Sequence, residues 1–215
     1  MKIKSLEESY FPDFAVLVIV NLIFLAVGFR LYAGIFNFSD YPISELGAVR
    51  TRIGVINNSS RRVFTLQMLF NTLYMIHIGN RMYREGSRLH RGYQFFARTT
   101  ALGTIIIMLP YDINNFIHSI GTGTMAASIL MITSLGAYEA KHRFAERGPI
   151  ILNAIAWTVL IIYGLSNALD LQSKQIIQKP TLAMLAVTLL TVSPYMEKLP
   201  FLPRKEEVPV KSEKS

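Results

Sequence analysis

Six long stretches of mostly apolar residues, separated by short polar segments, make up most of the chain. They run approximately over residues 11–36, 62–83, 93–109, 113–139, 150–169 and 180–196. A helix needs about 20 mostly apolar residues to cross the roughly 30 Å hydrocarbon layer of a bilayer. Membrane-spanning strands would instead alternate apolar with polar residues, a pattern absent from runs such as FAVLVIVNLIFLAV. The pattern therefore predicts an all-α integral membrane bundle of six transmembrane helices.

The polar segments between and beyond these stretches predict the domain organisation. Residues 1–10 are expected to form a cytoplasmic head, residues 11–197 the six-helix domain, and residues 198–215 a disordered cytoplasmic tail, because the tail alternates charge signs and contains Pro but no Trp or Tyr. The first apolar stretch exceeds the roughly 7–15 residues of a signal-peptide core, so we expect it to be retained as a span. The turn Pro110-Tyr111-Asp112 predicts a tight helical hairpin between the third and fourth stretches.

Composition supports a membrane protein and excludes several other classes. The 215 residues are 51% hydrophobic and 17% charged, with a mean hydropathy of +0.34. The chain has no cysteine, which excludes disulfides, thiolate metal sites and cysteine nucleophiles. Its net charge of +8 does not predict nucleic-acid binding, because the basic residues are dispersed along membrane edges, where they would meet anionic lipid headgroups.

The distribution of Lys and Arg predicts the orientation. With a cytoplasmic N-terminus, fourteen of these residues fall on the inner side and six on the outer side. The positive-inside rule then predicts a multi-pass membrane protein with both termini in the cytoplasm. Four of the six outer charges, Arg50, Arg52, Arg61 and Arg62, belong to the first connection or to the helix start that follows it.

The first outer connection, YPISELGAVRTR (residues 41–52), is richer in chemistry than a tether requires. Its apolar residues Ile43, Leu46, Val49 and Ile53 recur at three- and four-residue spacing, which predicts a short amphipathic helix lying in the interface or over the bundle mouth. Asp40 or Ser39 is expected to cap its start. A capped interfacial helix without further chemistry is the alternative interpretation.

Ionisable residues are expected to gather at the outer end of the bundle. His118 lies on the outer half of the fourth span, where an imidazole is either a functional group or a neutral ring that ties two helices together through Ser, Asn or a carboxylate. Arginine suits bidentate binding of phosphate, so a lipid headgroup is the expected ligand. The predicted ligand-binding residues are Glu45, Arg61, Arg62, Asp112, His118 and Asp170.

Two other functions remain open on the same residues. A lipid hydrolase or acyltransferase would use Ser44, Glu45, Asp112 and His118, either around a metal ion or as a Ser/His pair, but neither an HExxH nor a GxSxG motif is present. Whether the protein is an enzyme stays open, with a non-enzyme favoured; we expect no cofactor, and we assign no metal ligand. A small transporter or channel is the second alternative, although we find no repeat between the two halves of the chain and no span broken at its centre.

Two features of the spans predict helix packing. Ser119, Gly123 and Ala127 recur at spacing four and are expected to form a small-residue face that another helix approaches closely. Asn21, Asn71 and Asn153 would either line a path or tie neighbouring helices together.

Several of these motifs resemble one family of membrane proteins. YPISELGA after the first span, NNSSRRVF before the second, IHSIGTGTMA in the fourth and the six-span plan together resemble the DRAM/Frag/Sfk proteins over residues 11–197. That family includes the damage-regulated autophagy modulators, a factor that remodels the lipid of GPI anchors, and a prokaryotic branch of unknown function. Glu45 and Leu46 stand where the eukaryotic modulators tend to carry Asp-Thr, so the chain is nearer to the prokaryotic branch. That likeness implies the cell (cytoplasmic) membrane as its location.

The resemblance implies association with membrane lipids and adds interest to Ser44, Glu45 and His118. Together with the residue pattern, it leads us to expect a membrane protein that recognises or positions lipid headgroups at an outer polar pocket, in lipid organisation, remodelling or sensing. Membrane lipids are the expected partners. The sequence leaves open a homo-oligomer or a partner membrane protein.

Overall fold

The computed structural model describes residues 9–84, 89–171 and 174–196, and within these ranges the chain is all-helical. Six α-helices and two short 3-10 helices occur in this part of the chain, and an isolated antiparallel bridge joins Arg50 and Ile56. The predicted head is described only from residue 9, and the predicted tail lies outside the described residues. The elements are α1 (Phe11–Arg30), η2 (Ile43–Gly47), α2 (Asn58–Arg84), α3 (His90–Ile107), α4 (Asn115–Phe144), α5 (Gly148–Ala168), α6 (Lys174–Val192) and η3 (Ser193–Tyr195).

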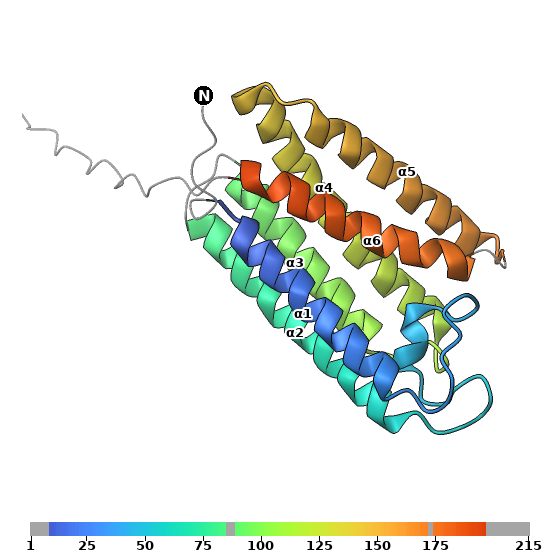
Figure 1. Ribbon diagram of the computed structural model, residues 1–215. Coiled ribbons are helices and arrows are strands. Elements are labelled where there is room, and N and C mark those ends of the chain that lie inside the picture. The colour runs from blue at the N-terminus through green and yellow to red at the C-terminus, as the bar shows by residue number, and fades with distance from the viewer. Residues whose placement is uncertain (1–8, 85–88, 172–173, 197–215) are drawn as a thin grey trace, which may run out of the picture.

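The helices lie roughly side by side along one direction, with α5 at one edge of the bundle and α2 at the other (Figure 1). Each helix contacts the next one along the chain, and α6 also contacts α4 and α1. The segment between α1 and α2, which contains η2, covers one end of this bundle (Figure 1). This is the end that the charge distribution predicts to face outward.

The six predicted helices are all present, and two of them differ in extent from the prediction. Helix α1 ends at Arg30 rather than near residue 36, and the chain then turns through Gly34, whose φ of 125° is readily adopted only by glycine. Helix α6 begins at Lys174 rather than at Pro180, which lies inside the helix. Proline at 180 therefore does not mark the helix start, although its missing N–H removes one backbone bond in the second turn.

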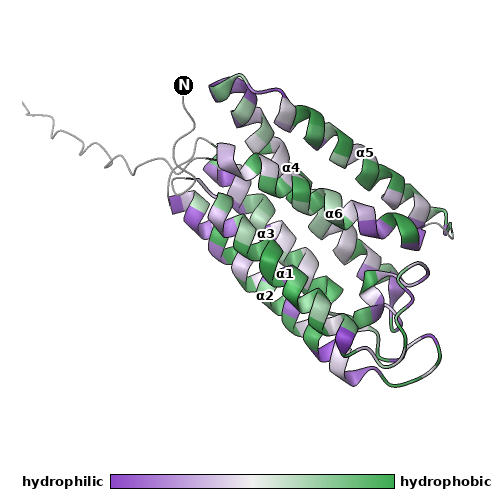
Figure 2. Cartoon of the chain, in the orientation of Figure 1, coloured by the Kyte–Doolittle hydropathy of each residue, from purple (hydrophilic) through white to green (hydrophobic). Residues whose placement is uncertain are grey.

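Four of the helices are long and apolar enough to cross a membrane. These are α1, α4, α5 and α6, whose most apolar windows have mean hydropathies of 2.2, 1.4, 1.8 and 1.5. Apolar residues cover most of α5 in Figure 2. The all-helical prediction is thus confirmed for the described residues, and the chain has the composition of a membrane protein.

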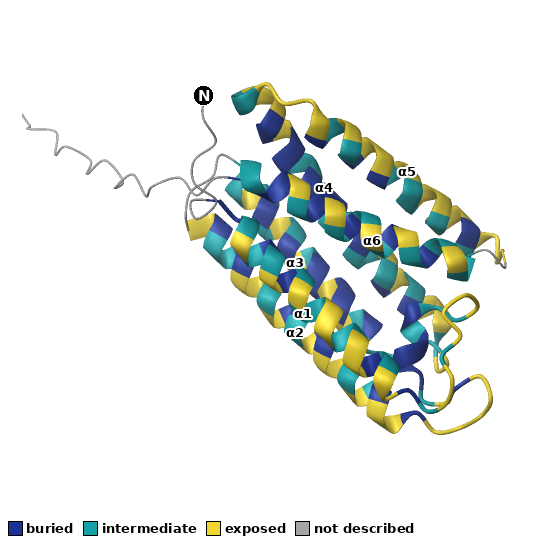
Figure 3. Ribbon diagram, viewed as in Figure 1, coloured by how far each residue is buried: buried dark blue, intermediate teal, exposed yellow. Residues whose placement is uncertain are grey.

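Helices α2 and α3 are less apolar on average, and the reason is visible in how α2 is buried. Its polar residues Gln67, Asn71 and Thr72 are buried against neighbouring helices. Its apolar residues Leu66 and Leu73 are instead 55% and 60% exposed. Buried and exposed residues alternate along these helices at helical spacing (Figure 3). Helix α2 therefore buries polar as well as apolar residues in the bundle and exposes several apolar residues outside it.

Polar side chains join neighbouring helices inside the bundle. Asn21 of α1 accepts from Gln67 and Asn71 of α2 at 2.7 and 2.9 Å, and it donates to Asn71 Oδ1 at 2.7 Å. On the other side of the bundle, Asn153 of α5 donates to Ser134 of α4 at 2.9 Å. The interpretation of Asn21, Asn71 and Asn153 as ties between helices is confirmed.

The predicted hairpin of α3 and α4 is present, but its close contact is not the predicted one. A Cβ atom on Gly103 would lie 2.6 Å from the backbone nitrogen of Met125 and 2.9 Å from the carbonyl oxygen of Gly121. Around Gly123, by contrast, an added Cβ would meet nothing within 4 Å. The prediction that Ser119, Gly123 and Ala127 form the close-packed face is therefore wrong, because α4 turns Gly121 rather than Gly123 toward α3.

Candidate functional site

Two buried polar side chains at the start of α2 fix the conformation of the outer segment. The Asn57 amide nitrogen donates to the carbonyl oxygens of Glu45, Leu46 and Ala48 at 3.2–3.4 Å, and its oxygen accepts from Ala33 N at 3.3 Å. The hydroxyl of Ser60 donates to the Leu46 carbonyl at 3.0 Å. Carbonyl groups that a short helix leaves unpaired are thereby satisfied.

The glycine of the ISELG motif is needed for this packing. A Cβ on Gly47 would lie 2.5 Å from Cδ1 of the Phe64 ring. Glycine therefore lets η2 rest directly on the aromatic ring of α2. The glycine of this motif is thus explained by the close approach of the η2 backbone to the Phe64 side chain.

The segment differs from the predicted amphipathic helix. It contains a 3-10 helix of five residues with Pro42 at its N-cap and no side-chain cap, so the expected capping by Asp40 or Ser39 is wrong. Ile43 and Leu46 are buried, whereas Ile53 is 70% exposed in a turn. The four apolar residues do not share one face, because the chain leaves the helix at Ala48 and doubles back between Arg50 and Ile56.

Glu45 is the centre of the hydrogen bonding in this segment. Its side chain is fully buried. Oε1 accepts from the Tyr32 hydroxyl at 2.9 Å and from the backbone nitrogen of Arg52 at 3.1 Å. Oε2 accepts from the Tyr111 hydroxyl and lies 3.7 Å from Nε of Arg52. The carboxylate thus joins the end of α1, the outer segment and the turn between α3 and α4.

Both tyrosines that donate to Glu45 are held in the neutral form. Burial, together with the hydrogen bond to Glu45, raises the pKa of Tyr32 and of Tyr111 well above the usual value near 10. Arg52 partly opposes this rise in the pKa of Tyr111. Both hydroxyls therefore remain hydrogen-bond donors at any physiological pH.

Asp112 has a structural role next to this centre. Its carboxylate accepts from the backbone nitrogens of Val49 and Arg50 at 3.0–3.1 Å. These bonds fasten the outer segment to the turn before α4. The structure places Asp112 near the predicted site, with its oxygens already engaged by backbone donors.

His118 lies at the start of α4 and is 5% exposed. Its Nδ1 lies 2.9 Å from the Leu109 carbonyl oxygen, and its ring makes an edge contact with Tyr111 at 6.2 Å between centroids. Since a carbonyl oxygen only accepts, Nδ1 carries the hydrogen, and a neutral ring keeps Nε2 as an acceptor. The partner of the ring is a backbone carbonyl rather than the predicted Ser, Asn or carboxylate.

A polar cavity of about 260 Å³ lies between the outer segment and helices α4, α5 and α6. Among the residues that line it, two are cationic, Arg52 and Lys174, and none is acidic. The others supply hydroxyl, amide and imidazole groups. The lining residues are Pro42, Ser44, Arg52, Tyr111, Asn115, His118, Ser119, Thr122, Tyr163, Asn167, Lys174, Gln175 and Gln178.

Glu45 shapes this cavity from behind, because it binds Arg52 and Tyr111 without itself lining the space. The Arg52 guanidinium also lies 5.1 Å from the centre of the Tyr41 ring. With its amide oriented to satisfy both neighbours, Gln175 accepts from Arg52 Nη2 at 2.7 Å and donates to the Asp40 carbonyl. Arg52 is therefore held from three sides.

Helix α6 supplies cavity residues that the sequence analysis did not identify. Gln178 accepts from the backbone nitrogen of Ile43 at 2.7 Å and donates to the Tyr163 hydroxyl at 3.3 Å. Lys174 pairs with the predicted ligand residue Asp170, which lowers the pKa of that carboxyl. The available signal was a pair of amide residues, Gln175 and Gln178, directly before the predicted stretch of residues 180–196. Because that stretch begins at Pro180, residues 174–178 fell outside the predicted helix.

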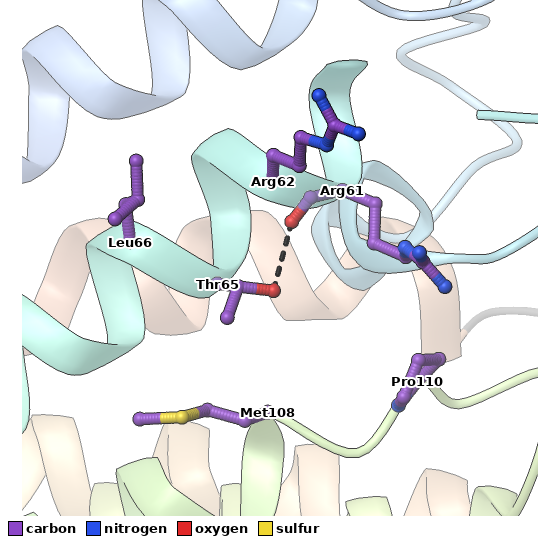
Figure 4. A pocket seen from close by; sticks show the side chains of 6 residues that line it. All are labelled: Arg61, Arg62, Thr65, Leu66, Met108 and Pro110. Atoms are coloured by element: carbon purple, nitrogen blue, oxygen red, sulfur yellow. Dashed lines mark hydrogen bonds between the residues drawn. The ribbon is translucent and has the colours of Figure 1, made fainter. Parts of the chain in front are cut away.

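The structure separates Arg61 and Arg62 from the other predicted ligand residues. Both line a different pocket, of about 490 Å³, with Thr65, Leu66, Met108 and Pro110. Figure 4 shows this pocket between the first turns of α2 and the end of α3. The single outer mouth of the sequence analysis thus consists of two pockets with no lining residue in common.

The positions of the acidic residues and of His118 can be compared with the two catalytic alternatives, a metal centre and a Ser/His pair. Within the described ranges, no three His, Asp or Glu side chains are grouped so that they could hold a metal ion. Glu45 and Asp112 instead bind tyrosine hydroxyls and backbone amides. Ser44 and His118 both line the polar cavity, but the Nδ1 partner of His118 is a carbonyl, which differs from the carboxylate of a Ser-His-Asp triad.

Comparison with known proteins gives no family assignment. No family model matches the chain, and no curated protein and no solved structure matches it. The resemblance to the DRAM/Frag/Sfk proteins therefore stays a prediction based on the motifs of residues 41–48, 57–64 and 117–126 and on the six-span plan.

Proposed function

We propose that this protein crosses the membrane six times and binds the anionic headgroup of a lipid in the outer polar cavity. The observation that carries the proposal is the composition of that cavity. Two cationic side chains and a set of hydroxyl and amide groups surround about 260 Å³, with no carboxylate among the lining residues. Arg52 and Lys174 already pair with Glu45 and Asp170, which do not line the cavity, so an anionic group would be held mainly by the hydrogen-bond donors around it.

The exposed face of α2 supports the six-span plan. In a bilayer, the apolar side chains Leu66 and Leu73 would face lipid, while Gln67 and Asn71 are satisfied inside the bundle. The 27 residues of α2 span about 40 Å and the 18 residues of α3 about 27 Å at 1.5 Å per residue. Both lengths are compatible with a hydrocarbon layer of about 30 Å.

The orientation is open to a direct test, because the chain has no native cysteine. Ser39 and Glu146 are exposed and lie in connections at opposite ends of the bundle. In our proposal, a membrane-impermeant maleimide labels Ser39→Cys in intact cells and labels Glu146→Cys only after permeabilisation. Labelling of both positions from the same side would contradict the six-span arrangement.

The size of the cavity favours a headgroup rather than a whole lipid. Pockets for drug-sized ligands enclose about 300–1,000 Å³, so this cavity suits a phosphate with a small polyol. Arg52 would engage phosphate oxygens, because a guanidinium forms paired hydrogen bonds with them. The hydroxyl and amide groups of α4, α5 and α6 would bind the polyol hydroxyls.

A pair of lysines in α6 gives a matched experiment. Lys174 lines the cavity, whereas Lys179, on the same helix, does not. We expect glycerol phosphate to raise the melting temperature of the purified protein, Lys174→Gln to reduce this rise, and Lys179→Gln to leave it unchanged. Glycerol without phosphate serves as the neutral probe. An equal response of both variants, or no response of the wild type to glycerol phosphate, would contradict headgroup binding in this cavity.

Lipid hydrolysis or acyl transfer is a second candidate, favoured by one observation. Ser44, Ser119 and His118 line the same cavity, so a hydroxyl nucleophile and an imidazole base would both be within it. A lipid panel incubated with wild-type protein and with His118→Ala tests this function. Turnover by the wild type that is lost in the variant would favour catalysis over binding alone.

A further inference from the structure

The pocket of Arg61 and Arg62 differs in kind from the polar cavity. Apart from the two arginines and Thr65, its lining is apolar, from Leu66, Met108 and Pro110. The Thr65 hydroxyl is already used, since it donates to the Arg61 carbonyl at 2.9 Å. Two cationic groups thus stand beside an apolar floor.

Neither arginine has an ion-pair partner among the residues that the structure describes. Arg52 and Arg81, by comparison, pair with Glu45 and Asp13. In Figure 4 the Arg61 side chain extends toward Pro110, while Arg62 extends the other way from the same turn of α2. The outer end of α2 therefore presents two uncompensated positive charges in adjacent positions.

An apolar strip leads from this pocket along the outside of the bundle. Leu66, Leu69 and Leu73 of α2 are 43–60% exposed and recur at three- and four-residue spacing, so they lie on one face. Leu102 and Ile105 of the neighbouring helix α3 are 53% and 49% exposed. From Leu66 to Leu73 the strip covers about 10 Å at 1.5 Å per residue.

We infer that the Arg61/Arg62 pocket holds the phosphate of an anionic phospholipid whose acyl chain lies along the strip of Leu66, Leu69 and Leu73. Arg61 makes the principal phosphate contact, because its side chain extends over the pocket, and Arg62 adds a second charge at the rim. The inference rests on the proposed membrane span of α2 but not on the polar cavity.

The charge of the site decides between lipid classes. A zwitterionic lipid would bring a choline or ethanolamine cation close to two guanidinium groups, which repel it. Phosphatidylglycerol carries a negative phosphate and a neutral polyol, and it meets no such repulsion. The site should therefore select phosphatidylglycerol over phosphatidylcholine.

The test is native mass spectrometry of the full-length protein released from nanodiscs of mixed phosphatidylglycerol and phosphatidylcholine. We expect retained phosphatidylglycerol to be reduced by Arg61→Gln and Arg62→Gln together, with affinity falling about fivefold for each arginine lost. Phosphatidylcholine retention should not change. Arg84→Gln, at the opposite end of α2, is the matched control and should behave as the wild type.

Three outcomes would overturn the inference. The first is that the double variant retains as much phosphatidylglycerol as the wild type. The second is that Arg84→Gln loses as much phosphatidylglycerol as the double variant. The third is that soluble glycerol phosphate competes with the lipid at equal affinity. Lys174→Gln separates this site from the polar cavity, because that variant should leave phosphatidylglycerol retention by Arg61 and Arg62 intact. The melting temperature in detergent, which substitution of the half-buried Arg61 and the exposed Arg62 should not alter, reports whether the variants are folded.

Discussion

Arg52 Nε lies 3.7 Å from Glu45 Oε2, which joins a fully buried carboxylate to a cationic side chain that is 39% exposed. The arginine thus faces the polar cavity on one side and is anchored to the interior on the other. Glu45 acts on the cavity as a positioning residue. Its four contacts involve the end of α1, the outer segment and the turn before α4.

Replacing Glu45 should destabilise the outer end of the bundle. In Glu45→Gln, the new amide would present hydrogens to hydroxyl donors, and the ion pair with Arg52 would be lost. We expect the free energy of unfolding to fall by about 1–3 kcal/mol, as for a buried polar group left without partners. Thermal unfolding in detergent micelles measures this change.

Asp40→Asn is the control, because Asp40 is exposed and its side chain accepts from the exposed Asn37 rather than from a buried group. That variant should unfold within about 0.5 kcal/mol of the wild type. If both variants lost the same free energy of unfolding, the buried contacts of Glu45 would not be the cause of the loss.

Stability should fall in alkaline solution because of the tyrosines bound to Glu45. The pKa of Tyr32 and of Tyr111 is raised by burial and by the hydrogen bond to Glu45, whereas in the unfolded chain these phenols ionise near pH 10. Above about pH 10 the folded state therefore holds more protons than the unfolded state, and stability decreases as pH rises. Below that pH this effect is constant.

The measurement is the melting temperature at pH 9, 10 and 11 for the wild type and for Tyr111→Phe. The variant should melt lower at pH 9, since it lacks the bond to Glu45, but lose less stability between pH 9 and pH 11. Parallel pH profiles for the two proteins would show that Tyr111 does not contribute to the alkaline transition.

Two glycines in α4 give a sharp contrast. A Cβ on Gly121 would lie 2.8 Å from Cγ2 of Ile106 and 3.0 Å from the carbonyl oxygen of Gly103, so Gly121→Ala must push α3 away. We expect this change to cost about 1–3 kcal/mol, the usual cost of overpacking. Gly123→Ala meets nothing within 4 Å and should be neutral or stabilising by up to about 1 kcal/mol. Equal melting temperatures for the two variants would contradict the close contact of α3 and α4.

The bond between Asn21 and Asn71 should contribute to the association of α1 with α2. Asn71→Leu removes both hydrogen bonds between these side chains. Polar ties of this kind contribute about 0.6 kcal/mol on average and up to about 1.7 in membrane proteins. Unfolding in mixed micelles should detect the loss, while Leu69→Ala on the exposed face of α2 should have a smaller effect. A larger effect of Leu69→Ala would place that residue in a packed interface.

Helix number and approximate bounds follow from local pattern, and for that reason the sequence analysis located all six α-helices. The apolar stretches and the turn at Pro110 depend only on residues close together in the chain. The rotation of a helix about its axis depends on its neighbours, which is why Gly121 rather than Gly123 meets α3. Contacts with distant residues also explain why the apolar spacing from Ile43 to Ile53 predicts an amphipathic helix, whereas the structure has a five-residue 3-10 helix followed by a turn.

The candidate site was predictable in part. Ser44, Arg52 and His118 share one cavity because the motif residues and the fourth span meet at the same end of the bundle. The partners of these residues come from distant segments, as in the bond between Gln178 and the backbone of Ile43, and local spacing carries no signal for such contacts. Sequence proximity to the first connection predicts the same mouth for Arg61 and Arg62, and it does not reveal that they line a separate pocket with Met108 and Pro110.

The buried polar residues of α2 have a consequence for how this chain changes by mutation. Substituting Asn71 with leucine would make the helix more apolar and, by average hydropathy alone, a better membrane segment. It would also remove the hydrogen bonds that hold α2 to Asn21. Along this helix, ease of entry into a bilayer and attachment to the bundle therefore favour opposite residues at the same position.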